Sequence, residues 1–226
     1  MATAAVLQST DDIETVELGR ADIGDIVAVH RAALAAMPRS ELVRPDGPET
    51  FNRMFDMGGE ILGLIEHRRL AGYGMLRPER DGMGDREGLA RVVPEAGVLF
   101  VVDGAAVHPE YWTRSLQRVL IRERLDHARR RGAGHVVATA APGNIASIRN
   151  LLKEGFRVVD GLRKSYGLRY VLHRQVREAE AVEPEIWGDL GDLDGSRSLF
   201  QAGYCATRFR LGDDARPELG FTERGT

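Results

Sequence analysis

Residues 105–156 decide the fold; they read AAVHPEYWTRSLQRVLIRERLDHARRRGAGHVVATAAPGNIASIRNLLKEGF. The pattern predicts a strand ending near Val107, a turn, and a helix over Arg114–Arg131. A buried strand over His135–Thr139 and a second helix over Ile145–Glu154 follow. Each helix begins soon after a strand ends. Unpaired N–H groups and the positive dipole end at such helix starts suit a ligand that carries phosphates.

The flanking residues continue the mixture of strands and helices. Gly97–Val107 contains a near-continuous apolar run, which is typical of a central strand covered on both faces. The polar, glycine-rich segment Pro78–Pro94 is predicted to leave the sheet. The remaining predicted elements are a strand (Glu14–Leu18), a helix capped by Asp22 that runs to about Ala36, a helix (Glu49–Met57), a hairpin (Glu60–Glu66 with Leu70–Leu76) and two closing strands (Phe156–Val159 and Arg169–Val176). Together they predict an α/β fold.

Composition limits the classes of protein that need to be considered. The chain has 226 residues, enough for one large domain or for a domain with an appendage. The single cysteine, Cys205, excludes an internal disulfide and a multi-cysteine metal site. No apolar run reaches membrane-spanning length, and Met1–Leu7 lacks the basic region of a signal peptide. We therefore expect a cytoplasmic protein that does not bind a membrane.

The charge is distributed unevenly along the chain. Residues 178–226 contain 11 acidic residues and 5 arginines, whereas residues 1–177 contain 23 acidic and 26 basic residues. A mildly basic body suits an anionic cofactor, but a nucleic-acid-binding protein usually has a stronger basic bias. We divide the chain into a flexible lead-in (1–13), a main domain (14–176) and an acidic C-terminal extension (177–226). The extension contains a strand-like patch, Tyr204–Leu211, and is expected to be a cover, a dimer arm or partly disordered.

Two motifs resemble those of the GNAT (general N-acetyltransferase) acyltransferase superfamily. Val107–Tyr111, followed by Arg114 and Leu116, resembles the opening of the acetyl-CoA motif. Asn144–Phe156 resembles the second motif, Asn-x-x-(Ala/Ser) followed by Gly-Phe. The resemblance covers roughly residues 14–176 in element order. It implies a mixed central sheet that splays open near Val107, helices on its flanks, and acetyl-CoA or another acyl-CoA as co-substrate.

The resemblance also implies which residues bind coenzyme A. The exposed backbone of Ala105, Ala106 and Val107 would pair with the pantetheine arm. Asn144 and Ser147, at the second helix start, would support that arm. Backbone N–H groups and side chains at the first helix start would hold the pyrophosphate, and the residues there are Arg114, Ser115, Leu116, Gln117 and Arg118.

The chain departs from the family pattern at two places. Family members usually carry Gln or Arg, two residues, Gly, one residue and Gly or Ala in the pyrophosphate loop, where this chain has Trp112, Ser115 and Gln117. Many members also place a tyrosine where this chain has Leu151, so that it can protonate the leaving thiolate. Here Tyr166, Tyr170 or water would serve, or no acid is needed. The atypical loop keeps open a non-catalytic or regulatory protein with weakened CoA binding.

The candidate general base is Asp103, which lies four residues before Val107 on the strand edge that would face the gap. A base there would deprotonate the incoming ammonium, so that the amine can attack the thioester. The alternative is an ordinary turn carboxylate. The acceptor would be bound by the first two helices and the loop Met37–Pro48, with Glu41, Arg44 and Asp46 as polar candidates. No His, Asp or Glu cluster has the spacing of metal ligands.

These features predict an acyl-CoA-dependent N-acyltransferase, most simply an N-acetyltransferase, that acts on the amine of a small molecule. Transfer would occur by direct attack in a ternary complex. A protein N-terminus or lysine is the alternative acceptor, and a homodimer is an open prediction.

Overall fold

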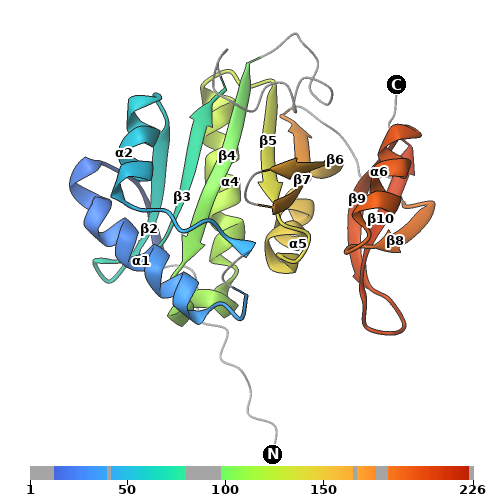
Figure 1. Cartoon of the computed structure of the whole chain (residues 1–226). Helices are drawn as coiled ribbons and strands as arrows, with labels where there is room; N and C mark the ends of the chain where they lie inside the picture. The colour runs from blue at the N-terminus through green and yellow to red at the C-terminus, as the bar shows by residue number, and fades with distance from the viewer. Residues whose placement is uncertain (1–12, 40–41, 80–97, 165–166, 177–182, 224–226) are drawn as a thin grey trace, which may run out of the picture.

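The structure is a computed structural model that describes residues 13–39, 42–79, 98–164, 167–176 and 183–223. Its centre is a ten-stranded sheet in the order β1-β2-β3-β4-β5-β7-β6-β9-β10-β8 (Figure 1). The strands of the main domain are β1 (Ile13–Leu18), β2 (Glu60–Glu66), β3 (Arg69–Pro78), β4 (Leu99–Val107), β5 (His135–Ala140), β6 (Arg157–Lys164) and β7 (Gly167–Gln175). Among the described strand pairs, β4 with β5 is the parallel one.

Helices cover both faces of this sheet. On one face, α1 (Ile23–Ala36) and α2 (Pro48–Asp56) pack on β2 and β3 through a cluster that includes Ile26, Phe51 and Tyr73. On the other face, α4 (Leu116–Arg130) and α5 (Ile145–Lys153) bury apolar side chains at helical spacing against β4, β5 and β7. The predicted α/β fold with a mixed sheet and flanking helices is confirmed.

Several element boundaries differ from the predictions for local reasons. The residues Pro109–Arg114 form a 3₁₀ helix, so α4 begins at Leu116 rather than at Arg114. Ser115 separates the two helices because its φ of 57° lies in the left-handed region. Asp22 precedes α1, but its carboxylate accepts the N–H of Gly19 and caps no helix N–H group. The predicted excursion and lead-in fall largely on residues 80–97 and 1–12, outside the described residues.

The C-terminal extension continues the sheet. It consists of β8 (Ile186–Asp189), α6 (Leu193–Gln201), β9 (Tyr204–Leu211) and β10 (Pro217–Glu223). β9 joins the edge of β6 through the pair Val158–Ala206, and α6 adds Leu193 and Phe200 to the same core as α4 and α5. Figure 1 shows this unit beside β6 at the end of the molecule far from α1 and α2. Of its elements, only β9 was predicted.

Candidate active site

The sheet opens between β4 and β5. Their parallel pairing covers Leu99 to Val101 on β4 and stops at the pair Val101–Val137. Beyond it, residues 102–107 of β4 keep β3 as a neighbour on one side but have no described strand on the other. Backbone groups along that edge are therefore available to a ligand. This is the splay that the sequence predicted near Val107.

A β-bulge lies on the open part of β4. The register between β3 and β4 shifts between the pairs Gly74–Ala105 and Leu76–Val102, so Asp103 and Gly104 together oppose Met75. A bulge bends its strand and redirects side chains, and bulges are common next to active sites. Here it lies just beyond the last β4–β5 pair, Val101–Val137.

Arg124 of α4 lies under this bulge with its guanidinium fully buried. Its Nη1 donates to the carbonyl oxygens of Asp103 at 3.1 Å and Met75 at 3.3 Å. Its Nε donates to Leu120 at 2.9 Å, within α4. Burial lowers the Arg124 pKa to about 10. A Cβ on Gly74 would lie 2.7 Å from Arg124 Nε, so this glycine leaves the space that the guanidinium needs.

A cavity of about 380 Å³ runs through the splay. One wall comes from α1, the loop after it and α2; the opposite wall comes from β5, the β6–β7 strands and the starts of α4 and α5. Seven of the predicted site residues line it: Asp103, Ala105, Gln117, Asn144 and Ser147, together with the acceptor candidates Arg44 and Asp46. Ala106 and Val107 continue the same open strand edge.

Asp103 projects beside the bulge and is held from two sides. Its Oδ2 accepts Arg77 Nε at 3.2 Å, and its Oδ1 accepts the N–H of Gly104 at 3.0 Å. The side chain stays 36% exposed, so solvent or substrate can reach it. Arg77 is itself buried and also pairs with Glu79. The carboxylate is thus held in one orientation and is open to the cavity, which gives a general base access to a bound amine.

The acceptor wall presents a second carboxylate to the bulge. Asp46 is only 7% exposed, pairs with Arg44 at 2.7 Å, and reaches to 3.5 Å from where a Cβ on Gly104 would lie. Its backbone N–H donates to His30 Nε2 at 3.0 Å, so the other ring nitrogen carries the proton and donates to Tyr73 at 2.8 Å. Burial lowers the His30 pKa. Glu41, the remaining acceptor candidate, lies outside the described residues.

The residue just before α4 has a backbone conformation typical of glycine, although it is a serine. Ser115 adopts φ 57° and ψ 19°, a conformation that glycine takes at little cost. The first helical N–H bonds come from Arg118 and Val119, so the N–H groups of Leu116 and Gln117 have no intrahelical acceptor. Trp112 is 45% exposed and donates from Nε1 to the Val107 carbonyl at 2.7 Å.

The polar side chains at this helix start pair within the protein. Arg114 donates to Glu66 at 2.6 Å, and this hydrogen bond holds the Glu66 pKa below its usual range. Arg118 donates to Glu154 at 2.6 Å. Gln117 lines the cavity and accepts Asn150 Nδ2 at 2.6 Å, which ties α4 to α5. Neither predicted arginine lines the cavity, so a phosphate role would have to compete with these partners.

The start of α5 faces the cavity. Asn144 caps the helix by accepting the Ser147 N–H at 3.2 Å, and both residues line the cavity together with Leu151. The amide NH₂ of Asn144 is left for other contacts. The position expected to carry a family tyrosine is therefore apolar and faces the site.

Two tyrosines were predicted as candidate acids that protonate the leaving thiolate. Tyr166 lies outside the described residues. Tyr170 is fully buried, and its hydroxyl bonds the Leu190 carbonyl at 2.9 Å and Ser196 at 3.1 Å in the C-terminal unit. Burial raises its pKa to about 12. Tyr170 does not line the cavity, because alternate residues of β7 face opposite sides of the sheet; its neighbour Arg169 lines it instead.

Sequence patterns did not single out five cationic residues of the cavity. They are Arg53, Arg77, Arg124, Lys164 and Arg169, which come from α2, β3, α4, β6 and β7 and are brought together only by the fold. Arg124 was hidden because it belongs to an arginine-rich helix whose other arginines are mostly exposed. Its place on the apolar side of α4, between Ile121 and Leu125, was the available signal.

The model of the acetyltransferase (GNAT) family matches residues 27–156, more than half of the chain. The chain belongs to the GNAT acetyltransferase family. Among curated proteins, no sequence matches it significantly. The helices of the described residues include none long and apolar enough to cross a membrane, and the same residues hold no cluster of three or more metal-ligating side chains.

Solved structures share the GNAT fold with this chain. The yncA protein of Salmonella typhimurium, solved with its cofactor acetyl-CoA, is 21% identical with a TM-score of 0.55, over 76% of this chain and 98% of that one. The ribosomal-protein-S18-alanine N-acetyltransferase of Escherichia coli is 17% identical with a TM-score of 0.56, over 74% and 96%. A GCN5-related N-acetyltransferase from Kribbella flavida is 17% identical with a TM-score of 0.56, over 74% and 99%. At these identities the likeness concerns the fold.

Proposed function

We propose that this GNAT protein transfers an acyl group, most simply acetyl, from acyl-CoA to the amine of a small molecule. The observation that carries the proposal is the cavity at the splay, where the open edge of β4 and the carboxylate of Asp103 face one space. Transfer occurs by direct attack of the amine in a ternary complex, with no covalent enzyme intermediate.

The residues present fit a CoA thioester. The open edge of Ala105, Ala106 and Val107 offers backbone groups to the pantetheine amides, with Asn144 and Ser147 across the gap. The N–H groups of Leu116 and Gln117 at the start of α4 offer donors to phosphate. Bound acyl-CoA supplies the activated acyl group; the protein has to orient it and exclude competing water.

The chain's own groups then handle the protons. Asp103 accepts a proton from the acceptor ammonium, directly or through water, and Arg77 keeps the carboxylate turned toward the cavity. A backbone N–H at the bulge polarises the acyl carbonyl, because a preoriented donor stabilises developing negative charge without reorganisation. Because the Tyr170 hydroxyl is hydrogen-bonded to the C-terminal unit and Leu151 is apolar, we assign protonation of the leaving thiolate to water or to Tyr166.

One binding experiment and one assay test this proposal. Calorimetry with acetyl-CoA is expected to give micromolar affinity, and thiol release with a panel of small amines is expected to show turnover that depends on the amine. If acetyl-CoA binds but no acyl donor gives turnover, the proposed enzyme activity is refuted. The absence of CoA binding would instead favour the second candidate.

The second candidate is a regulatory GNAT-fold protein with weakened CoA binding. Two observations favour it: the Trp112 ring lies on the loop that would receive the pyrophosphate, and the Gln117 side chain projects into the cavity. A protein N-terminus as acceptor is the third candidate, and an N-terminal peptide panel in the same assay would detect it.

The wider assignments stay predictions. We propose residues 14–176 as the catalytic domain, 1–13 as a lead-in and 177–226 as an accessory unit. A cytoplasmic location can be tested by fractionation, and the homodimer by light scattering of the purified chain.

A further inference from the structure

We propose that the acceptor carries an anionic group, a carboxylate or a phosphate, in addition to its amine. This proposal rests on the proposed function and names its substrate class. The geometry points to a zwitterionic amine rather than a neutral or purely cationic one.

The charge of the cavity lining is the first observation. Its described side chains include six cations against two carboxylates, Asp46 and Asp103. The cations are Arg44, Arg53, Arg77, Arg124, Lys164 and Arg169. His30 adds no charge at neutral pH because burial lowers its pKa. A site built for a simple ammonium would show the opposite balance, because an opposite charge stabilises a bound ion.

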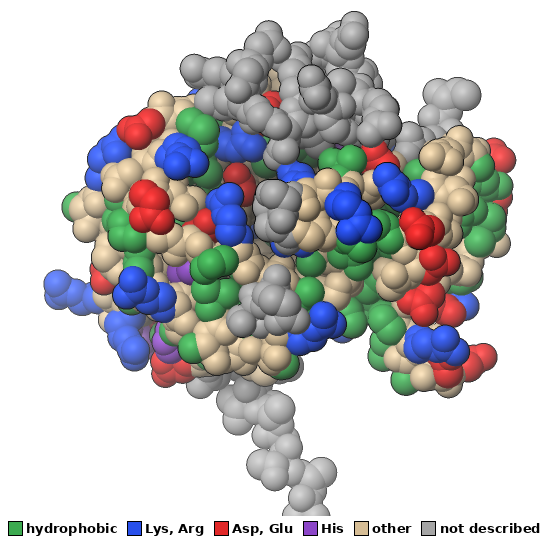
Figure 2. Space-filling view, viewed as in Figure 1, with side chains coloured by type: hydrophobic (Ala, Val, Ile, Leu, Met, Phe, Trp, Pro, Cys, Tyr) green, Lys and Arg blue, Asp and Glu red, His purple; other side chains and the backbone are tan. Residues whose placement is uncertain are grey.

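Three of the six cations hold groups at the bulge and the acceptor loop: Arg77 pairs with Asp103, Arg44 pairs with Asp46, and Arg124 donates to carbonyl oxygens under the bulge. The other three line the cavity from α2 (Arg53), β6 (Lys164) and β7 (Arg169), and the Arg169 guanidinium also donates to the Leu168 carbonyl at 2.7 Å. The two strands are adjacent there, since Leu162 pairs with Arg169. Figure 2 shows Lys and Arg side chains gathered on this face, from α2 across to the β6–β7 strands.

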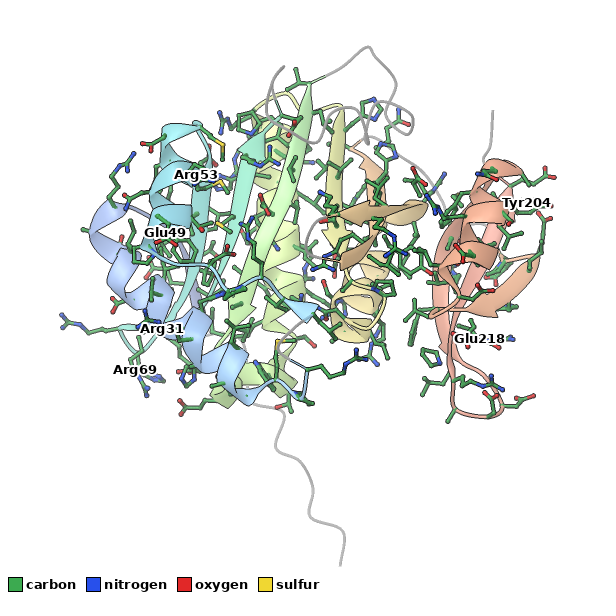
Figure 3. All side chains as sticks on the ribbon, in the orientation of Figure 1. Arg31, Glu49, Arg53, Arg69, Tyr204 and Glu218 are labelled. Atoms are coloured by element: carbon green, nitrogen blue, oxygen red, sulfur yellow. The ribbon has the colours of Figure 1, made fainter. Side chains whose placement is uncertain are left out.

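Arg53 is the clearest member of this group. It lines the cavity from α2, it is exposed, and its guanidinium makes no hydrogen bond or ion pair with another residue in the described part of the chain. Figure 3 shows Arg53 on α2 and Arg31 on α1. A cation in that position can meet a substrate anion without breaking an internal pair.

The cofactor does not account for these cations. The cavity residues contributed by the starts of α4 and α5, where CoA is expected, are the uncharged side chains Gln117, Ile121, Asn144, Ser147 and Leu151. Arg53, Lys164 and Arg169 instead come from α2 and from the β6–β7 strands. The two carboxylates of the lining lie together on the acceptor side, where Asp46 and Asp103 flank Gly104 at the bulge.

This arrangement matches a substrate with two charges. The ammonium would lie at Gly104, between the two carboxylates, where Asp103 can take its proton. The anionic group would then point toward Arg53 or toward Lys164 and Arg169. Arginine binds both carboxylate and phosphate through paired N–H donors, so the lining alone suits either anion.

The test uses the full chain and matched pairs of acceptors. One pair is an α-amino acid and its methyl ester; the other is an aminoalkyl phosphate and the corresponding amino alcohol. Calorimetry in the presence of CoA is expected to show at least tenfold tighter binding of the anionic member in one pair, and which pair responds identifies the anion. Equal affinity within both pairs, or no binding of any member, would overturn the proposal.

Acyl transfer is measured in a separate assay, so the proposed enzyme activity and the proposed anionic acceptor can be refuted independently. If the anionic acceptor binds but no acyl transfer follows, the enzyme assignment fails and the anionic binding site stands. If the neutral members are acylated as efficiently as the anionic ones, the enzyme assignment stands and this inference fails.

Two arginine variants locate the anion. Arg53→Glu is expected to reduce the affinity ratio of anionic to neutral acceptor about tenfold and to leave acetyl-CoA affinity unchanged. Arg31→Glu is the matched control: Arg31 is also an exposed helical arginine, but it does not line the cavity. An equal loss for both members of a pair in Arg53→Glu, or the same effect in Arg31→Glu, would contradict the assignment. Lys164→Gln tests the opposite wall in the same way.

Discussion

Arg124 holds the bulge of β4 through the carbonyl oxygen of Asp103, which lies 3.1 Å from Nη1. The side chain of Asp103 faces the cavity while its backbone is held from the opposite face of the sheet by α4. The candidate base is therefore fixed from two sides, by Arg77 on its carboxylate and by Arg124 on its carbonyl.

Arg124→Met is expected to destabilise the protein and loosen the bulge. The substitution removes a buried charge, which is favourable, but leaves two buried carbonyl oxygens without their donor, at about 1–3 kcal/mol each. We expect the free energy of unfolding in urea to fall by roughly 1–3 kcal/mol and hydrogen exchange at Gly104 to increase. Arg122→Met is the control, since Arg122 is 56% exposed on the same helix. An unchanged exchange rate at Gly104 would contradict this role of Arg124.

Asp103→Asn is expected to lower kcat/KM about 10²- to 10⁴-fold while acetyl-CoA affinity is preserved, because the amide keeps the shape but cannot accept the proton. Glu79→Gln provides the comparison, since Glu79 also pairs with Arg77 and does not line the cavity. If both variants lose activity equally, Asp103 acts only as a structural partner of Arg77.

Ser115→Gly is expected to increase both stability and cofactor affinity. A side chain in the left-handed region costs roughly 1–2 kcal/mol, offset in part by the greater unfolded-state entropy of glycine. We expect the free energy of unfolding in urea to rise by up to about 1 kcal/mol. We also expect calorimetry to show severalfold tighter acetyl-CoA binding. Ala215→Gly is the control because Ala215 has a φ of 61° in the β9–β10 turn, outside the cavity. Ala215→Gly should raise the free energy of unfolding in the same way but leave acetyl-CoA affinity unchanged. If Ala215→Gly also tightened acetyl-CoA binding, the affinity gain of Ser115→Gly would not indicate a role for residue 115 in cofactor binding.

His30 is expected to make stability depend on pH. Its folded pKa is lowered by burial, so the unfolded chain binds the proton more readily. Stability from this group is therefore fully present above the unfolded pKa of about 6.5 and is lost as pH falls toward the folded value. Urea unfolding between pH 7.5 and 5, values chosen to span about 6.5, should show a smaller decline in His30→Gln than in the wild type. His67→Gln, at a side chain 77% exposed, should leave the decline unchanged.

The sequence predicted the parts of the fold that depend on local periodicity. The apolar run ending at Val102 marked the central strand, and Asn144–Phe156 marked the second helix and its family motif. The bulge could not be predicted, because it depends on the pairing of Asp103 and Gly104 with Met75, which is distant in sequence. Whether Tyr170 faced the cavity or the C-terminal unit depended in the same way on the register of β7.

The C-terminal unit was missed for a different reason. The segment before Ser198 is rich in Gly and Asp and no helix was predicted there, yet Asp192 caps α6 by accepting the Gly195 N–H at 2.9 Å. Leu193, Ser196 and Phe200 are then buried on one face of the helix. That spacing was present in the sequence, but a nine-residue helix with two glycine neighbours gives a weak signal.

The position of this unit affects how the protein behaves in solution. Without it, β6 would end the sheet with the eight residues Arg157–Lys164 on an open edge, a template for pairing with other chains. With it, β9 pairs with β6 at Val158–Ala206, Leu193 of α6 packs against β6 at Gly161, and the outermost strand is β8, only four residues long. Short edge strands resist the strand addition that leads to aggregation. Residues that contribute nothing to the cavity lining can thus determine whether the enzyme remains dispersed at the concentrations at which it is made.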